Sequence, residues 1–129
     1  MSRGRALSLW APVVLNMALI FGLSSVAQPP ELPGPGIEYF DKYVHVILYA
    51  GLSAWFIRAR AGGWSRRITL GAALTAVIFS TAYGVTDELH QYFVPPRQSD
   101  ALDVAADAIG ATLAAGLLYA GIIRTRHGL

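Results

Sequence analysis

Ionisable side chains recur at one-turn intervals in apolar parts of this chain, and these residues have the types and spacing that could do chemistry. Asp103 and Asp107 are four positions apart, so a helix would place both carboxylates on one face. Asp41, His45 and Tyr49 have the same spacing and would form a second polar stripe. Such groups could hold a hard cation, act as general acids or bases, or bind a polar head group.

A third polar stripe is predicted on one arc of another helix, near its outer end, formed by Gly84, Asp87, Glu88 and Gln91. If the three stripes face one another, they line a polar pocket at one end of a helical bundle, with Arg97 on the loop above it. The predicted pocket residues are Asp41, Lys42, His45, Tyr49, Glu88, Gln91, Arg97, Asp103 and Asp107. The candidates for catalysis are Glu88, His45 and Asp103, and those for metal binding are Glu88, Asp103 and Asp107.

Each of these side chains also has a purely structural interpretation. Asp41 could cap a helix, and His45 could be a hydrogen-bonded packing residue. Arg97 could serve only as a counter-ion within an internal salt-bridge network that holds the bundle together. Asp87 and Asp100 are interpreted as ordinary solvated loop charges.

The elements that must position these residues are predicted to be membrane helices. Apolar residues make up 54% of the chain and charged residues only 14%, against about 25% in soluble domains. Residues 6–30 and 68–86 contain no charge, and each stretch reaches the roughly 20 residues that cross a bilayer. Two shorter charge-free runs, 46–57 and 108–123, become long enough only by including polar residues at one end. The prediction is an all-α, four-helix membrane bundle forming a single domain over residues 1–129, with spans at about 6–27, 39–57, 68–90 and 101–123.

The distribution of charge predicts how the bundle is oriented. In this model eight of the ten basic residues fall on one side of the membrane, and all eight acidic residues fall on the other. The positive-inside rule then places both termini in the cytoplasm and the polar pocket on the external side. An alternative for the first span is a cleaved signal peptide, because small residues at 25–27 resemble a cleavage site.

The composition also bears on cofactors and partners. The chain has no cysteine, which excludes disulfides, iron–sulfur clusters and cysteine zinc sites. No cofactor is required by the sequence, and a divalent cation is left open. We expect membrane lipid as a partner and no nucleic acid, and the sequence makes no prediction of oligomeric state.

Four separated motifs, at residues 41–45, 84–91, 93–97 and 103–111, resemble the successive motifs of VanZ-like membrane proteins. Ser24 and Ser25 are similar to that family's serine pair, so the resemblance extends over about residues 19–117. It implies a multi-pass protein of the bacterial cytoplasmic membrane, in a family named after an accessory protein of teicoplanin resistance. It implies no particular reaction. The residues it carries over as a site are Asp41, Lys42, His45, Glu88, Gln91, Arg97 and Asp103.

Two positions depart from the pattern of that family. Asp107 stands where the family commonly has asparagine, and Pro96 where it commonly has glycine. A carboxylate at residue 107 puts in doubt any role that needs an amide donor there. Because this carboxylate lies deepest in the predicted membrane, we expect it to be protonated or to be neutralised by a cation such as Lys42, His45 or Arg97.

Three classes of function remain open from the sequence. The first is an accessory or binding role in the cell envelope, in which the pocket engages an envelope lipid, a lipid-linked precursor or a lipoglycopeptide. The alternative is a membrane-embedded enzyme acting on a lipid head group, with Glu88 or His45 as acid or base. The third is an ion- or proton-coupled transporter, although transporters usually carry polar groups near the midplane and the inner half of this chain has few.

Overall fold

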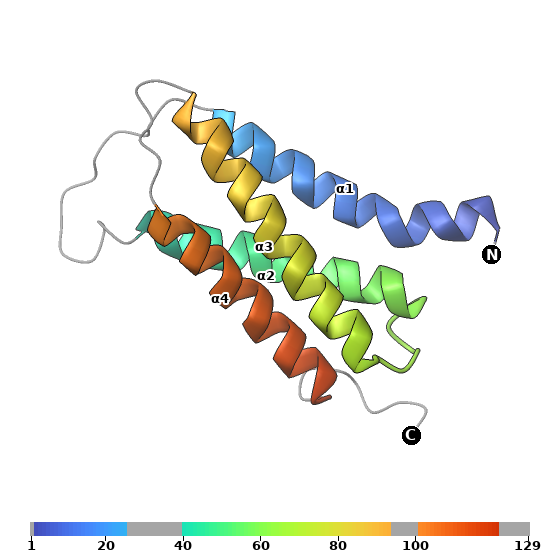
Figure 1. Cartoon of the computed structure of the whole chain (residues 1–129). Helices are drawn as coiled ribbons and strands as arrows, with labels where there is room; N and C mark the ends of the chain where they lie inside the picture. Colours follow the sequence, from blue (N-terminus) through green and yellow to red (C-terminus); the bar gives the residue numbers. More distant parts are fainter. Residues whose placement is uncertain (1, 26–39, 94–100, 122–129) are drawn as a thin grey trace.

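The computed structural model describes residues 2–25, 40–93 and 101–121, and these residues form four α-helices. The helices are α1 (Arg3–Ser25), α2 (Phe40–Ala61), α3 (Leu70–Tyr92) and α4 (Ala101–Tyr119), and no strand occurs within these ranges. Figure 1 shows them side by side in one bundle, with successive helices running in opposite directions. The prediction of an all-α chain is confirmed.

Two helix ends differ from the predicted spans for local reasons. α2 continues past residue 57 to Ala61, and its last turn carries Arg58 and Arg60, where basic side chains complement the negative end of the helix dipole. The helix ends before Gly62, whose φ of 91° is easily adopted only by glycine. α4 ends at Tyr119 rather than at residue 123, shortly before another positive φ of 77° at Gly121.

Three of the helices are suited to cross a membrane by length and composition. These are α1 over Arg3–Ser24, α3 over Leu70–Tyr92 and α4 over Ala101–Tyr119. Among the described residues, α2 does not meet the same criteria, because the charged side chains near both its ends lower its hydropathy. A fourth span through α2 and the orientation of the termini therefore stay predictions.

α2 and α4 pack against each other with their backbones unusually close. A Cβ atom added to Gly110 on α4 would collide with the backbone carbonyl oxygen of Val46 on α2. Further along α2, the Ser53 hydroxyl donates a hydrogen bond of 2.9 Å to the backbone oxygen of Ala111 on α4. Small residues allow this approach, as is typical of membrane helices. The approach brings the polar side chains at the start of both helices within contact distance.

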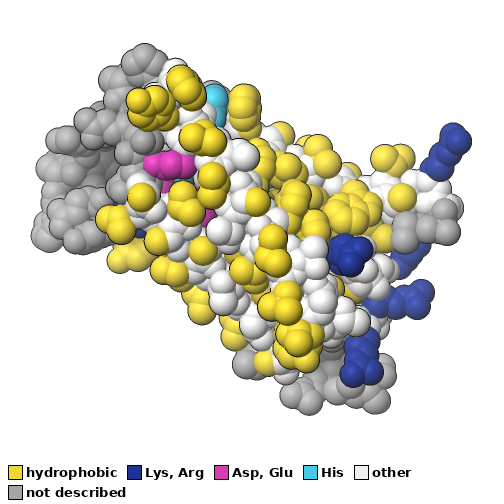
Figure 2. Space-filling view, in the orientation of Figure 1, with side chains coloured by type: hydrophobic (Ala, Val, Ile, Leu, Met, Phe, Trp, Pro, Cys, Tyr) yellow, Lys and Arg dark blue, Asp and Glu magenta, His cyan; other side chains and the backbone are white. Residues whose placement is uncertain are grey.

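α1 and α3 complete the bundle around this pair. The Asn16 amide donates to the Leu48 backbone oxygen at 3.1 Å, and the Tyr83 hydroxyl donates to the Met17 backbone oxygen at 2.8 Å. The outer surface is strongly apolar, with large side chains such as Ile78 about two-thirds exposed. Figure 2 shows this apolar girdle between arginines at one end and acidic and histidine side chains at the other. An apolar belt between two polar ends is the surface that a bilayer would cover.

Candidate functional site

The polar side chains gather at the end of the bundle where α1 and α3 finish and α2 and α4 begin (Figure 1). The alternating direction of the helices brings these four ends together. Ser24 and Asp87 lie near the ends of their helices, whereas His45 and Asp103 lie near the starts of theirs. All four are buried.

The closest contact in this cluster joins α2 and α4. His45 Nδ1 lies 2.6 Å from Asp107 Oδ1, a hydrogen-bond distance, and the two residues are only 6% and 1% exposed. Asp107 reaches this position because α3 has a glycine opposite: a Cβ atom on Gly84 would lie 2.6 Å from Asp107 Oδ2. His45 is thus the partner of the deepest carboxylate, as one of the alternatives from the sequence predicted.

A second contact between α2 and α4 lies one turn nearer the end of the bundle. Lys42 Nζ donates to Asp103 Oδ1 at 2.7 Å, and Asp103 Oδ2 lies 3.8 Å from His45 Nε2. The Asp103 side chain is almost fully buried, whereas that of Lys42 is 25% exposed. Lys42, Asp103, His45 and Asp107 therefore follow one another as a continuous series of polar contacts from the edge inwards.

α3 contributes Asp87, which the sequence analysis assigned to solvent. That interpretation is wrong, because Asp87 lies within α3, is 7% exposed and accepts a 3.2 Å hydrogen bond from Gln91 Nε2. The Tyr49 hydroxyl of α2 lies beside the same carboxylate. Glu88, the predicted site residue, is one position along the helix and only half-buried. The i, i+4 pair of Asp87 with Gln91 was a signal in the sequence that could have identified Asp87.

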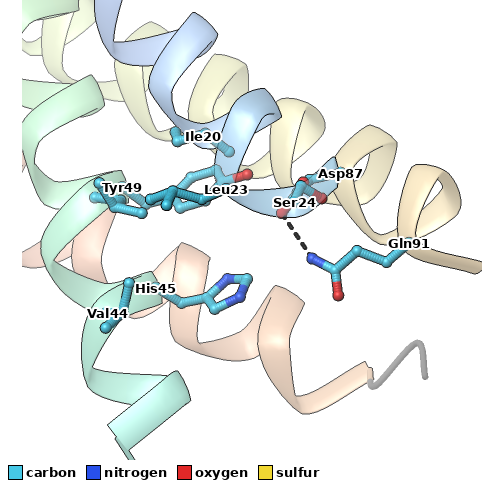
Figure 3. A pocket seen from close by; sticks show the side chains of 9 residues that line it. Ile20, Leu23, Ser24, Val44, His45, Tyr49, Asp87 and Gln91 are labelled. Atoms are coloured by element: carbon cyan, nitrogen blue, oxygen red, sulfur yellow. Dashed lines mark hydrogen bonds between the residues drawn. The ribbon is translucent and has the colours of Figure 1, made fainter. Parts of the chain in front are cut away.

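A small cavity lies between α1, α2 and α3 beside these groups (Figure 3). Its volume of about 40 Å³ is room for two or three waters, since one water needs roughly 10–15 Å³ by the same measure. Figure 3 shows the His45 ring and the Gln91 amide extending towards this space from different helices, with Ser24 on α1 above them. The lining residues are Ile20, Leu23, Ser24, Val44, His45, Leu48, Tyr49, Asp87 and Gln91.

Ser24 was noted in the sequence only as part of a motif and was not assigned to the pocket. It is 3% exposed, and its hydroxyl has no hydrogen-bond partner within the described part of the chain. No polar stripe marks it, because Ile20 and Phe21, one turn before it on α1, are both apolar.

The remaining predicted site residues either lie outside the cavity or fall outside the described residues. Lys42 and Asp103 belong to the polar series but do not line the cavity. Arg97 and the side chain of Asp41 fall outside the described residues. The predicted metal ligands Glu88, Asp103 and Asp107 also differ from the group that the helices bring together. Among the described residues that group is His45, Asp87 and Asp107, whose ligand atoms all lie within 4.8 Å of one another.

Comparison with known proteins identifies the family of this chain. The model of the VanZ/LLP1 family matches residues 6–124, which is nearly the whole length. No curated protein and no solved structure matches the chain. The resemblance inferred from the four motifs is confirmed, and the apolar helices agree with a membrane protein. The chain belongs to the VanZ/LLP1 family.

Proposed function

We propose that this protein is an accessory protein of the bacterial cell envelope that binds a polar group of an envelope lipid, a lipid-linked precursor or a lipoglycopeptide. The observation that carries the proposal is the cavity bounded by Ser24, His45, Asp87 and Gln91 at one end of an apolar bundle. These side chains offer both donors and acceptors, and they are protected from bulk water.

In the proposed topology the chain crosses the cytoplasmic membrane four times with both termini inside. Figure 2 shows most of the Lys and Arg side chains at the end of the bundle opposite the acidic and histidine side chains, which supports an external cavity under the positive-inside rule. The charges at the two ends of α2 fit a span whose charged residues lie at the membrane surfaces. A ligand would then reach the cavity from the outer leaflet.

The size of the cavity limits what enters it. Room for two or three waters admits a hydroxyl, an amine or a single carboxylate oxygen, whereas the rest of the ligand would lie at the membrane surface. Ser24 is suited to contact such a group because its hydroxyl has no partner among the described residues. A buried hydroxyl without a partner costs stability, and a ligand would recover that cost.

The decisive test replaces Ser24 without disturbing the bundle. We expect Ser24→Ala to leave the melting temperature unchanged or higher and to weaken ligand binding roughly fivefold, the equivalent of about one hydrogen bond. Ser80→Ala is a matched control, because Ser80 is also buried, with a hydroxyl that has no partner in the described ranges, but it does not line the cavity. Binding of teicoplanin and of a polyprenyl-diphosphate-linked saccharide to protein in nanodiscs would be measured, together with teicoplanin susceptibility of cells. Equal binding by the two variants would contradict the proposal.

A second candidate is an enzyme acting on a lipid head group. It is favoured by the 2.6 Å contact between His45 Nδ1 and Asp107 Oδ1, because a carboxylate that orients a histidine is the usual support of a general base. Turnover of a lipid-linked substrate that disappears in His45→Gln, while the melting temperature is maintained, would favour this candidate over binding alone. Absence of turnover in the unaltered protein would exclude it for that substrate.

A further inference from the structure

We propose that His45, Asp87 and Asp107 form a binding site for one divalent transition-metal ion. The three residues come from α2, α3 and α4, so the ion would join three helices at the polar end of the bundle. The inference goes beyond the proposed binding role and does not depend on which lipid or precursor is bound.

The first argument is geometric. The candidate ligand atoms, one from each residue, all lie within 4.8 Å of one another. Ligand atoms around a metal at 2.0–2.2 Å are separated by roughly 3 Å, so a side-chain movement on the order of 1 Å would complete the set. His45 Nδ1 and Asp107 Oδ1 are already 2.6 Å apart and would separate slightly to admit the ion. Gly84 allows the Asp107 carboxylate to occupy this position, because a Cβ atom on residue 84 would lie only 2.6 Å from Asp107 Oδ2.

The second argument is that buried polar atoms at this place have unused bonding capacity. Asp107 Oδ2 and the Ser24 hydroxyl have no hydrogen-bond partner among the described residues, although both side chains are more than nine-tenths buried. A buried carboxylate oxygen without a donor is costly, and so is a pair of carboxylates in a low dielectric. A divalent cation between Asp87 and Asp107 would relieve both costs. The adjoining cavity has room for the two or three waters that would complete the coordination.

The surrounding residues have the contacts expected of a supporting outer layer. Gln91 Nε2 donates to Asp87 Oδ2 and so fixes that carboxylate. Asp103 Oδ2 lies 3.8 Å from His45 Nε2, where it could accept a hydrogen bond after a small shift and leave Nδ1 for the metal. A ligating histidine usually donates its second nitrogen to a carboxylate in this way.

The donor set indicates which ions fit. An imidazole with two carboxylates suits zinc, manganese or iron, whereas magnesium and calcium prefer oxygen ligands alone. Three protein ligands with water in the remaining positions is the composition of an open metal site. We therefore expect Zn²⁺ and Mn²⁺ to bind in preference to Mg²⁺ and Ca²⁺.

The test uses the full chain in detergent or nanodiscs after treatment with a chelator. Isothermal titration with Zn²⁺, and the electron paramagnetic resonance signal of Mn²⁺, would give the affinity and the number of ions per chain. We expect one ion per chain, with an affinity that falls roughly tenfold or more in Asp87→Asn and in Asp107→Asn. Glu88→Gln is the matched control, because it removes the next carboxylate along α3 and should keep the affinity of the unaltered protein.

Each outcome of this experiment has a defined meaning. The metal-free melting temperature of every variant establishes that it is folded, and Asp107→Asn is the second variant should Asp87→Asn fail to fold. Failure of the folded, unaltered protein to bind Zn²⁺ or Mn²⁺ would overturn the proposal. Equal losses in Glu88→Gln and Asp87→Asn would also overturn it, because the ions would then be responding to surface charge. Neither result bears on ligand binding through Ser24, which is measured without added metal.

Discussion

Replacing each of the two carboxylates of α4 by asparagine is expected to have opposite effects on the stability of the metal-free protein. Asp103 accepts a 2.7 Å hydrogen bond from Lys42, whereas Asp107 lies deeper and 2.6 Å from His45. Asparagine preserves the shape of both side chains and removes only the charge. We expect Asp103→Asn to destabilise the bundle and Asp107→Asn to be tolerated.

The contacts set the size of each effect. A hydrogen bond to a charged group contributes about 1.5–3 kcal/mol when it is buried. The Lys42 side chain is 25% exposed, and an amide oxygen could still accept from it, so Asp103→Asn should cost about 1–2 kcal/mol. At Asp107 an amide oxygen can still accept from His45, and the loss of a buried charge offsets the weaker bond. The free energy of unfolding should therefore change by less than about 0.5 kcal/mol, or rise.

Reversible unfolding in mixed micelles, with a chelator present, would measure both free energies. A double-mutant cycle with Lys42→Gln would separate the ion pair from other effects of Asp103→Asn, and its coupling energy should account for most of the loss. If Asp107→Asn proves more destabilising than Asp103→Asn, the assignment of Asp107 as an accommodating acceptor is refuted. The ionised carboxylate would then be required for the fold.

Further predictions concern packing and topology. Gly110→Ala should destabilise the bundle by at least about 2 kcal/mol, because the added Cβ atom would collide with the backbone of α2. Gly116→Ala should be neutral or stabilising, since no atom lies within 4 Å of the position that its Cβ atom would take. Thermal melts of the two variants would test this difference. Single cysteines at Pro35 and Ser99 should react with an impermeant reagent in intact cells, whereas one at Gly63 should not, and labelling at Gly63 but not at Ser99 would overturn the proposed orientation.

Much of the architecture followed from the sequence alone. Charge-free stretches of membrane length predicted α1 and α3, and a shorter run with polar residues at one end predicted α4. The one-turn spacing of Asp103 and Asp107 predicted that both would lie on one face of α4, and both are buried against α2. These features are local, because they depend only on helix periodicity and on the length of a bilayer crossing.

The tertiary structure decided which face of each helix points inwards. From the sequence, Glu88 was predicted to belong to the site and Asp87 to be a solvated loop charge. The two are adjacent, and one position changes the direction of a side chain by about 100° around the helix axis. In a soluble protein, the apolar stripe of the helix would have indicated which of the two residues faces the core. On a membrane helix the faces towards lipid and towards the other helices are both apolar, so the hydrophobic pattern does not indicate the inner face. Only the packing of the other helices against α3 directs Asp87 to His45 and Asp107, and only the packing of α1 brings Ser24 to the same cavity.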